Sequence, residues 1–232
     1  MSKIASCAFI CIIFEVEMPR KKEFDVDVVL DKAMRAFWQR GYEATSLNDL
    51  LDCMQIQRAS LYNAFGDKHS LFLETLRRYD VVCRRAEIAR RVRLPSSRQA
   101  ILGLFRDAVT AVVEHGARNG CFLINTALEL APHDPKVAKV VREAFTHMEQ
   151  KFFRKMIEKG RANGEIDKSV IPSTTARALL SLLIGLVVLS RSRPEKLLLQ
   201  SIAKQAEALL PPVDKAAPAL AVSGAASPLF IQ

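Results

Sequence analysis

Residues 41–68 read GYEATSLNDLLDCMQIQRASLYNAFGDK, and this stretch decides the fold. Thr45 or Ser46 can cap a first short helix, whose apolar residues are spaced for one face of a helix: Leu47, Leu50, Leu51 and Met54. A turn follows at residues 55–56, and a second short helix is predicted over residues 58–65, where a glycine ends it. Two helices of about two turns joined by a tight turn are typical of a helix-turn-helix unit.

The chain around this unit is also helical. A 3.6-residue apolar stripe predicts a helix over residues 25–40, and Asp67 caps a long helix that ends before Pro95. Further helices are predicted near residues 97–115, 119–131, 134–162, 173–190 and 195–210. The sequence has no internal repeat and no strand-forming alternation, so it predicts an all-α protein: an amino-terminal three-helix helix-turn-helix domain joined by a long helix to a second helical domain.

The pattern divides the chain into four parts. Residues 18–68 are predicted to form the helix-turn-helix domain, and residues 69–210 the second domain. Residues 1–17 are interpreted as a non-native or disordered extension, because Met18 begins a basic arm that suits a chain start. Residues 211–232 are rich in Ala, Pro, Ser and Val without a period, which predicts a disordered tail.

The second short helix has a face suited to the major groove of DNA. Its core needs Leu61 and Phe65, which leaves the other side chains to face outward: Arg58, Ala59, Ser60, Tyr62 and Asn63. Arginine can donate two hydrogen bonds to guanine, asparagine can pair with adenine, and tyrosine and serine can donate to phosphate. Lys68 begins the next helix, whose free backbone amides also attract phosphate.

Residues 41–50 (GYEATSLNDL) and 60–68 (SLYNAFGDK) resemble the amino-terminal domain of the TetR/AcrR family of bacterial transcriptional regulators. The resemblance spans about residues 25–72. It implies an all-helical homodimer that binds a palindromic operator in double-stranded DNA and usually represses transcription until a small-molecule effector binds its carboxy-terminal domain. Residues 69–210 would then be the effector-binding and dimerisation domain. The resemblance assigns phosphate contacts to Thr45, Tyr62 and Lys68, and the groove face to Arg58, Ala59 and Asn63.

The turn of the helix-turn-helix departs from the family pattern. The family usually has Ala-Gly-Val-Ser, whereas this chain has Met54-Gln55-Ile56-Gln57. Gln55 therefore replaces a glycine that adopts a positive φ, and Gln57 replaces a helix cap. A side chain in that conformation costs about 1 kcal/mol, so we expect the fold to persist with a slightly strained turn.

Composition fits a globular protein with a polyanionic partner. Of 232 residues, 50% are hydrophobic and 25% charged, and the formal net charge is +9. The basic residues are spread along the chain, so charge alone is a weak argument for DNA. The arginines between residues 84 and 93 form a second basic cluster, which we interpret as mainly a solvated face. The cysteines at positions 7, 11, 53, 83 and 121 lack CxxC or Cys/His ligand spacing, which predicts neither a disulfide framework nor a metal site.

The second domain is predicted to hold the effector between residues 97–115 and 134–162. Its wall would combine apolar residues with a few polar ones: Phe105, Val109, Cys121, Phe122, Asn125, Glu129, Phe145, Met148 and Phe152. Asn125 and Glu129, one turn apart, are the expected polar contacts. An ordinary helix-bundle core would show the same apolar stripe. No cofactor is implied.

Cys121 is a candidate sensor of oxidants or electrophiles. It follows Gly120 at a predicted helix start, near His115 and Arg118, and a thiol in such a place has a lowered pKa. Some members of the resembled family respond to such compounds through cysteine. The alternative is a small buried side chain.

A homodimer is predicted through residues 173–210. The run Leu182–Leu189 is apolar on every face, so a helix there needs neighbours on all sides, and Gly185 would allow a second helix to approach closely.

Alternative functions are a helical enzyme, a ligand-binding protein with no DNA role and a plain interaction module. The chain has no recognisable catalytic motif, but scattered residues such as Glu129 with His133 or His147 could form a catalytic site. The apolar runs at residues 4–14 and 178–189 are shorter than the roughly 20 residues that cross a bilayer. We therefore expect a cytoplasmic protein that does not contact membranes.

Overall fold

The computed structural model describes residues 24–213. It has helices α1 (Val26–Arg40), α2 (Leu47–Met54), α3 (Arg58–Phe65), α4 (Lys68–Tyr79), α5 (Ala86–Val92), α6 (Ser97–Val113), α7 (Phe122–Glu129), α8 (Pro135–His147), α9 (Lys155–Ala162), α10 (Pro172–Ser192) and α11 (Lys196–Ala208). Two π-helical segments, η1 (Asp80–Arg85) and η2 (Met148–Arg154), interrupt this series. Residues 24–213 contain no strand, which confirms the all-α prediction. The predictions for residues 1–17 and for nearly all of 211–232 lie outside the described residues.

Three side-chain caps fix the helices of the amino-terminal domain. Asp25 accepts hydrogen bonds from the first amides of α1, and Asp67 accepts one from the Ser70 amide in α4. Ser46 and Asp49 form a reciprocal capping box at the start of α2. Each cap satisfies amides that the helix itself leaves free. The core between these helices is fully buried and mostly large: Phe37, Leu50, Leu61, Leu71 and Phe72.

The turn between α2 and α3 has the predicted conformation. Gln55 has φ 59° and ψ 43°, which is the left-handed region, and Gln57 precedes α3 without a side-chain cap. The side chain of Gln55 accepts a weak hydrogen bond from Lys32 Nζ at 3.4 Å. Unusual residues in the turn therefore leave the helix-turn-helix geometry intact.

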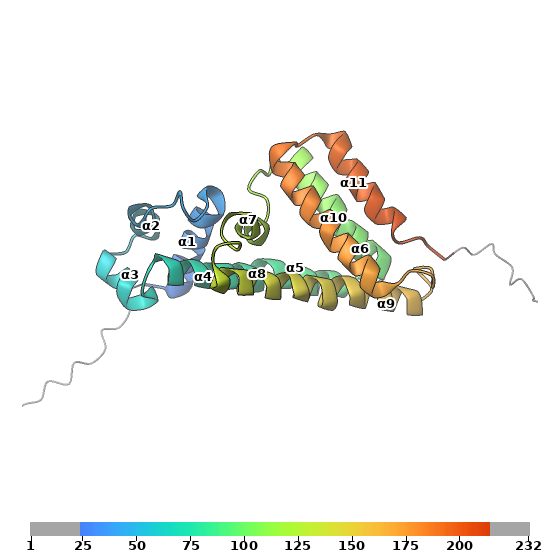
Figure 1. Ribbon diagram of the computed structural model, residues 1–232, viewed down its shortest axis with the longest axis horizontal. Coiled ribbons are helices and arrows are strands. Elements are labelled where there is room, and N and C mark those ends of the chain that lie inside the picture. Colours follow the sequence, from blue (N-terminus) through green and yellow to red (C-terminus); the bar gives the residue numbers. More distant parts are fainter. Residues whose placement is uncertain (1–23, 214–232) are drawn as a thin grey trace, which may run out of the picture.

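Two long helical rods run along the molecule (Figure 1). One consists of α4, η1 and α5, and the other of α8, η2 and α9, so each predicted long helix contains a π-helical segment. A π turn accommodates one more residue than an α turn and is frequent at functional sites. The apolar spacing did not predict these segments, because it remains helical through them.

The second domain is built on α6, η2, α9, α10 and α11 around a core that includes Phe105, Phe152, Phe153 and Leu179. Helix α7 lies between this bundle and the amino-terminal domain (Figure 1). It begins at Phe122 rather than at the predicted residue 119, because Gly120 has φ +64° and Cys121 is the N-cap.

Helix α10 is only partly enclosed by its own chain. Leu179, Leu183 and Leu186 are buried in the core, whereas Ala178, Gly185 and Val188 are half-buried on another face. Within the described residues α10 is long and apolar enough to span a membrane by composition, with a mean hydropathy of 1.7 over an 18-residue window. A core helix with an interface face has the same composition. Leu183 and Leu186 therefore have their neighbours within the chain, and the homodimer through residues 173–210 stays a prediction.

We predict that Gln55→Gly raises the free energy of unfolding by about 0.5–1 kcal/mol, because glycine adopts the left-handed region without the side-chain penalty. Urea unfolding followed by circular dichroism measures the change. Gln57→Gly is the control: Gln57 has φ −77°, so glycine there brings only its entropic cost and should destabilise. Equal stability of the two variants would contradict the strain at Gln55.

Candidate DNA-binding surface and effector cavity

The outward face of α3 is available to DNA. Arg58, Ala59 and Asn63 are exposed and Tyr62 is 46% exposed, whereas Leu61 and Phe65 are buried. Arg58 Nη2 donates to Asn48 Oδ1 at 3.0 Å, which links α3 to the exposed side of α2. The predicted orientation of α3 is thus confirmed, and its contacts with DNA stay a prediction.

Thr45 and Lys68, the predicted phosphate contacts beside α3, differ in how accessible their side chains are. Thr45 is fully buried and its hydroxyl donates to the Gly41 carbonyl at 2.6 Å, so its side chain is not available to a phosphate. That prediction is wrong because the hydroxyl closes the loop before α2. Lys68 begins α4 beside this surface, and its Nζ lies 4.2 Å from the centroid of the Tyr42 ring. The aromatic ring holds the ammonium group at the end of the helix.

A cavity of about 250 Å³ lies in the second domain, bounded by η1, α5, α6, α7, η2 and α10. Most of its wall is apolar and includes Ile88, Leu104, Leu123, Met148, Leu183 and Ile184. Its polar lining comes chiefly from the rod that joins the two domains: Tyr79, Cys83, Arg84, Glu87 and Arg91, with Cys121 opposite. An apolar chamber with a few polar groups is suited to a small organic ligand.

Only part of the predicted cavity wall lies on this chamber. Cys121, Phe145, Met148 and Phe152 line it. Phe105 is fully buried in the bundle core, with its ring 6.4 Å from that of Phe153. Phe122 is also buried, and it faces Phe72 and Tyr79 at the junction of the domains. Helical spacing identified these aromatic residues as inward-facing but did not show which chamber or core they enter.

Asn125 and Glu129 do not line this chamber but a second hollow of about 290 Å³ beside Phe122 and Trp38, so their contact with an effector stays a prediction. Asn125 Nδ2 donates to the Asn119 carbonyl at 2.8 Å. Glu129 Oε1 accepts hydrogen bonds from the amides of Tyr42 and Glu43 at 2.9 and 3.1 Å. Glu129 therefore fastens the end of α7 to the loop before α2. This contact joins residues far apart in the sequence, so no local pattern could have revealed it.

Further contacts join α7 and its neighbours to the amino-terminal domain. Trp38 Nε1 donates to the Asn119 carbonyl at 3.1 Å, and the Trp38 ring lies 5.1 Å from that of Tyr79. His69 Nε2 lies 2.5 Å from Asp134 Oδ2, which ties α4 to the N-cap of α8. One end of α7 thus lies on the cavity and the other on the helix-turn-helix domain.

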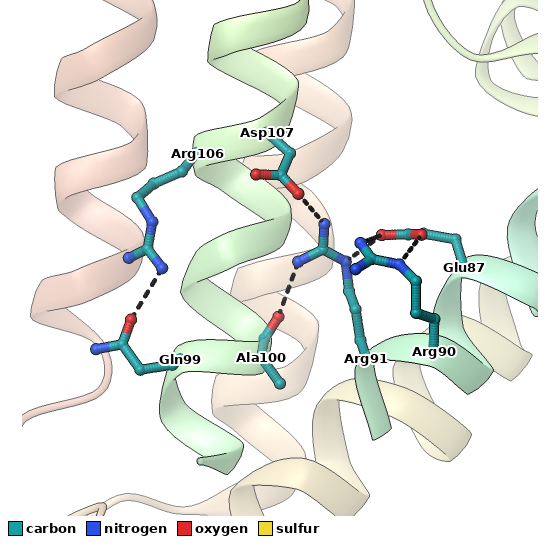
Figure 2. Close-up of polar contacts among 7 residues, drawn as sticks. All are labelled: Glu87, Arg90, Arg91, Gln99, Ala100, Arg106 and Asp107. Carbon is teal, nitrogen blue, oxygen red and sulfur yellow. Dashed lines mark hydrogen bonds and ion pairs between the residues drawn. The ribbon is translucent and has the colours of Figure 1, made fainter. Parts of the chain in front are cut away.

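The buried side chain of Arg91 is the centre of an ionic network (Figure 2). Its side chain is 3% exposed, and its three nitrogens reach three acceptors: Glu87 at 2.6 Å, Asp107 at 2.5 Å and the Ala100 carbonyl at 3.3 Å. Glu87 also pairs with exposed Arg90 at 2.7 Å. Hydrogen bonding to Arg90 and the charge of both arginines lower the pKa of Glu87 despite its partial burial. The network joins α5 to α6.

Arg84 is the second buried arginine of this wall. Its Nε donates to Asp80 Oδ1 at 2.5 Å, and Arg85 Nε donates to the other oxygen of Asp80 at 2.8 Å. The interpretation of the arginines at 84–93 as a solvated face is therefore wrong for Arg84 and Arg91, whose side chains are buried and paired with carboxylates. Arg85 and Arg90 remain exposed.

Two thiols lie on the cavity wall. Cys121 is the N-cap of α7, and the Tyr79 hydroxyl donates to its sulfur at 3.5 Å. Burial raises the pKa of Cys83, and burial together with Cys121 raises the pKa of Tyr79. His115 and Arg118 are exposed in the loop before α7. The sensor role of Cys121 stays a prediction.

The alternative catalytic pairs, Glu129 with His133 or with His147, use two histidines at opposite ends of α8. Glu129 is held by the loop before α2, and His133 precedes α8, whereas His147 ends that helix. A helix of 13 residues places its two ends about 20 Å apart. Within residues 24–213 no group of His, Cys, Asp and Glu has the arrangement of a metal site.

Comparison with known proteins identifies the class. Residues 29–75 match the family model described as "Bacterial regulatory proteins, tetR family", and residues 98–205 match "Tetracyclin repressor-like, C-terminal domain". YezE of Bacillus subtilis, an uncharacterized HTH-type transcriptional regulator, is 36% identical over 64% of this chain and 78% of its own. ComR of Escherichia coli, an HTH-type transcriptional repressor, is 31% identical over 74% of this chain and 82% of its own.

Solved structures of TetR-family proteins have the same fold as this chain. A cysteine mutant of the TetR-family regulator CifR, complexed with a 26-bp double-strand operator DNA, superposes with a TM-score of 0.71 and 29% identity over 84% of this chain and all of its own. Reduced NemR of Escherichia coli shares the fold, with a TM-score of 0.74 and 17% identity over 80% of this chain and 96% of its own. The chain belongs to the TetR family and is a DNA-binding transcriptional regulator. This family is one of regulators and not of enzymes.

We predict that Arg91→Met lowers the free energy of unfolding by about 2–3 kcal/mol, because it removes charge-assisted hydrogen bonds and leaves Glu87 and Asp107 without their shared cation. Arg90→Met is the matched control. Its guanidinium is 60% exposed, and an exposed pair contributes about 0–1 kcal/mol. Unfolding of both variants in guanidinium chloride measures the difference between their free energies of unfolding. Equal losses would show that burial does not distinguish the two ion pairs.

Proposed function

We propose that this regulator is a repressor that binds a palindromic operator as a homodimer and is released when a small molecule enters the cavity. The observation that carries this proposal is the double attachment of α7: Cys121, Leu123 and Ile124 line the cavity, and Glu129 holds the loop before α2. It acts in the cytoplasm, where the operator is.

The cavity has two routes to the DNA-binding surface. Tyr79 and Arg84 lie on the rod whose first residue is Lys68, so a displacement of this wall moves the end of α4. The other route is α7, which ends at Glu129. A ligand that fits better when these walls are displaced shifts the population away from the operator-binding arrangement. The effect equals the difference in its affinity for the two arrangements.

The dimer interface is assigned to α10 and α11. On α10 the half-buried and exposed residues recur with helical spacing and are small: Ala178, Ser181, Gly185 and Val188. A Cβ atom at Gly185 would meet nothing within 4 Å, so this face is open in the single chain. Leu197 at the start of α11 is 82% exposed. Small residues allow close helix packing, and a two-fold axis would present two α3 helices to the operator half-sites.

We predict separate effects for two residues of α3. Arg58→Ala should reduce the preference for the operator by about 1–3 kcal/mol if the guanidinium pairs with a base. Tyr62→Phe should weaken binding to every sequence about equally, because it removes only a hydroxyl that donates to phosphate. Titration of the protein's own promoter and of a scrambled duplex at several salt concentrations measures both.

Exposed Arg93 provides the control for that experiment, since Arg93→Ala removes the same charge from the far end of the rod. It should leave the operator preference unchanged. Wild-type protein that binds promoter and scrambled DNA equally well would contradict the proposed function.

We predict that Gly185→Lys yields a monomer that keeps its helical content and binds the operator at least ten-fold more weakly. The open space at Gly185 accommodates the lysine side chain without disturbing the core of the single chain. Burying its charge against a second copy of the chain would disfavour the dimer. Sedimentation velocity at micromolar concentration measures the mass. Ala89→Lys, at an exposed position of α5, should remain dimeric. A wild-type protein that sediments as a monomer would contradict the interface.

A further inference from the structure

The cavity is mainly apolar, and the charged residues of its wall are two arginines and Glu87, which pairs with Arg91. Two arginines contribute to it, Arg84 from η1 and Arg91 from α5, and both are at least nine-tenths buried. The sulfur of Cys121 and the hydroxyl of Tyr79 already contact each other at 3.5 Å. The recognition chemistry of the chamber therefore depends on which guanidinium has a nitrogen without a hydrogen-bond partner.

In Arg91 no nitrogen lacks an acceptor. Each of its three nitrogens has an acceptor in the network that joins α5 to α6 (Figure 2). Two carboxylates, Glu87 and Asp107, also compensate its charge. Arg91 therefore supports the wall and does not attract an anion to the cavity.

Arg84 is different. Its side chain is 9% exposed, and Nε and Nη2 both face Asp80. Nη1 is buried and has no hydrogen-bond partner among the described residues. A buried nitrogen without a partner costs free energy that a bound acceptor would recover, and this nitrogen belongs to a residue of the cavity wall.

The charge around Arg84 is also incomplete. Asp80 is the shared carboxylate of both Arg84 and Arg85, so one negative charge faces two positive ones. Burial and the positive charge of these two arginines lower the pKa of neighbouring His147. A second negative charge at Arg84 would complete this cluster, as the carboxylates do for Arg91.

We propose that the effector is a small apolar carboxylate, whose carboxylate group accepts hydrogen bonds from Arg84 Nη1 and whose hydrocarbon part fills the chamber between η1, η2 and α10. This inference rests on the proposed function, because it names the ligand class of the same cavity. The cavity holds roughly eight water volumes, which suits a chain or ring of medium length.

The test compares three probes of equal length by isothermal titration calorimetry: octanoate, 1-octanol and octylammonium. Octanoate should bind at least ten-fold more tightly than octanol, since a hydrogen bond between two charged groups is worth at least that ratio. Octylammonium should not bind. Binding of octanoate should also change the fluorescence of Trp38, whose ring lies 5.1 Å from that of the cavity residue Tyr79.

Matched variants assign the effect to Arg84. Arg84→Met keeps the length of the side chain, and Asp80 keeps Arg85 as its partner, so the fold should persist and octanoate affinity should fall at least ten-fold to that of octanol. Arg85→Met is the control, because Arg85 is the other partner of Asp80 but does not line the cavity. This variant should bind octanoate like the wild type. If Arg84→Met does not fold, Ile184→Trp, which fills the chamber, should abolish octanoate binding instead.

Equal affinity of the wild type for octanoate and octanol, or full octanoate affinity in Arg84→Met, would overturn the proposal. Gel-shift assays with promoter DNA separate it from the proposed function. Operator binding without octanoate selectivity contradicts only the ligand class. Arg84-dependent octanoate binding by a protein that lacks operator preference contradicts only the regulatory function.

Discussion

The structure depends on one aromatic junction between its two domains. Phe72 of α4 is fully buried, and the edge-on contacts of its ring reach Phe37 at 5.0 Å, Tyr42 at 4.8 Å and Phe122 at 5.6 Å. Phe37 and Tyr42 belong to the helix-turn-helix domain, whereas Phe122 begins α7. Such rings add specific geometry to their burial, so the junction fixes the angle between α4 and α7. The core of the DNA-binding domain therefore continues into the domain that holds the cavity.

Because the core is continuous, the polar contacts at its rim act on both domains. Glu129 accepts two backbone hydrogen bonds from the loop before α2, and Gly41 makes room for its carboxylate. At Gly41, with φ +89°, a Cβ atom would lie 2.9 Å from Glu129 Oε1. The glycine that the helix-turn-helix pattern contains thus has a second use, since it allows α7 to approach. The DNA-binding surface and the cavity wall are positioned by the same short helix.

Buried charge shapes the other side of the cavity. Burying a guanidinium is costly unless carboxylates and hydrogen bonds compensate it. Arg91 is compensated completely, which fixes α5 against α6. Arg84 shares its carboxylate with Arg85 and keeps a nitrogen free. It lies in η1, where the rod leaves α-helical geometry, so the least satisfied charge and the irregular backbone coincide beside the cavity.

The sequence alone determined the features that arise from local spacing. The 3.6-residue stripes and caps predicted the helices, the replacement of glycine by Gln55 predicted a positive φ, and the needs of the α3 core predicted that Arg58 and Tyr62 face outward. The spacing of apolar residues reports which side of a helix is buried. Predictions from spacing were therefore correct for features that depend on one helix alone.

Only the tertiary structure decided what each buried side faces. Thr45 has a hydroxyl that could bind phosphate but is buried in a loop. Glu129 was expected in the effector cavity, but it lies outside the chamber between the rods and holds that loop. Arg84 and Arg91 belong to one run of arginines. Packing gave every nitrogen of Arg91 an acceptor but left Nη1 of Arg84 without one. These outcomes depend on contacts between residues distant in sequence, and periodicity carries no information about the partner across a core.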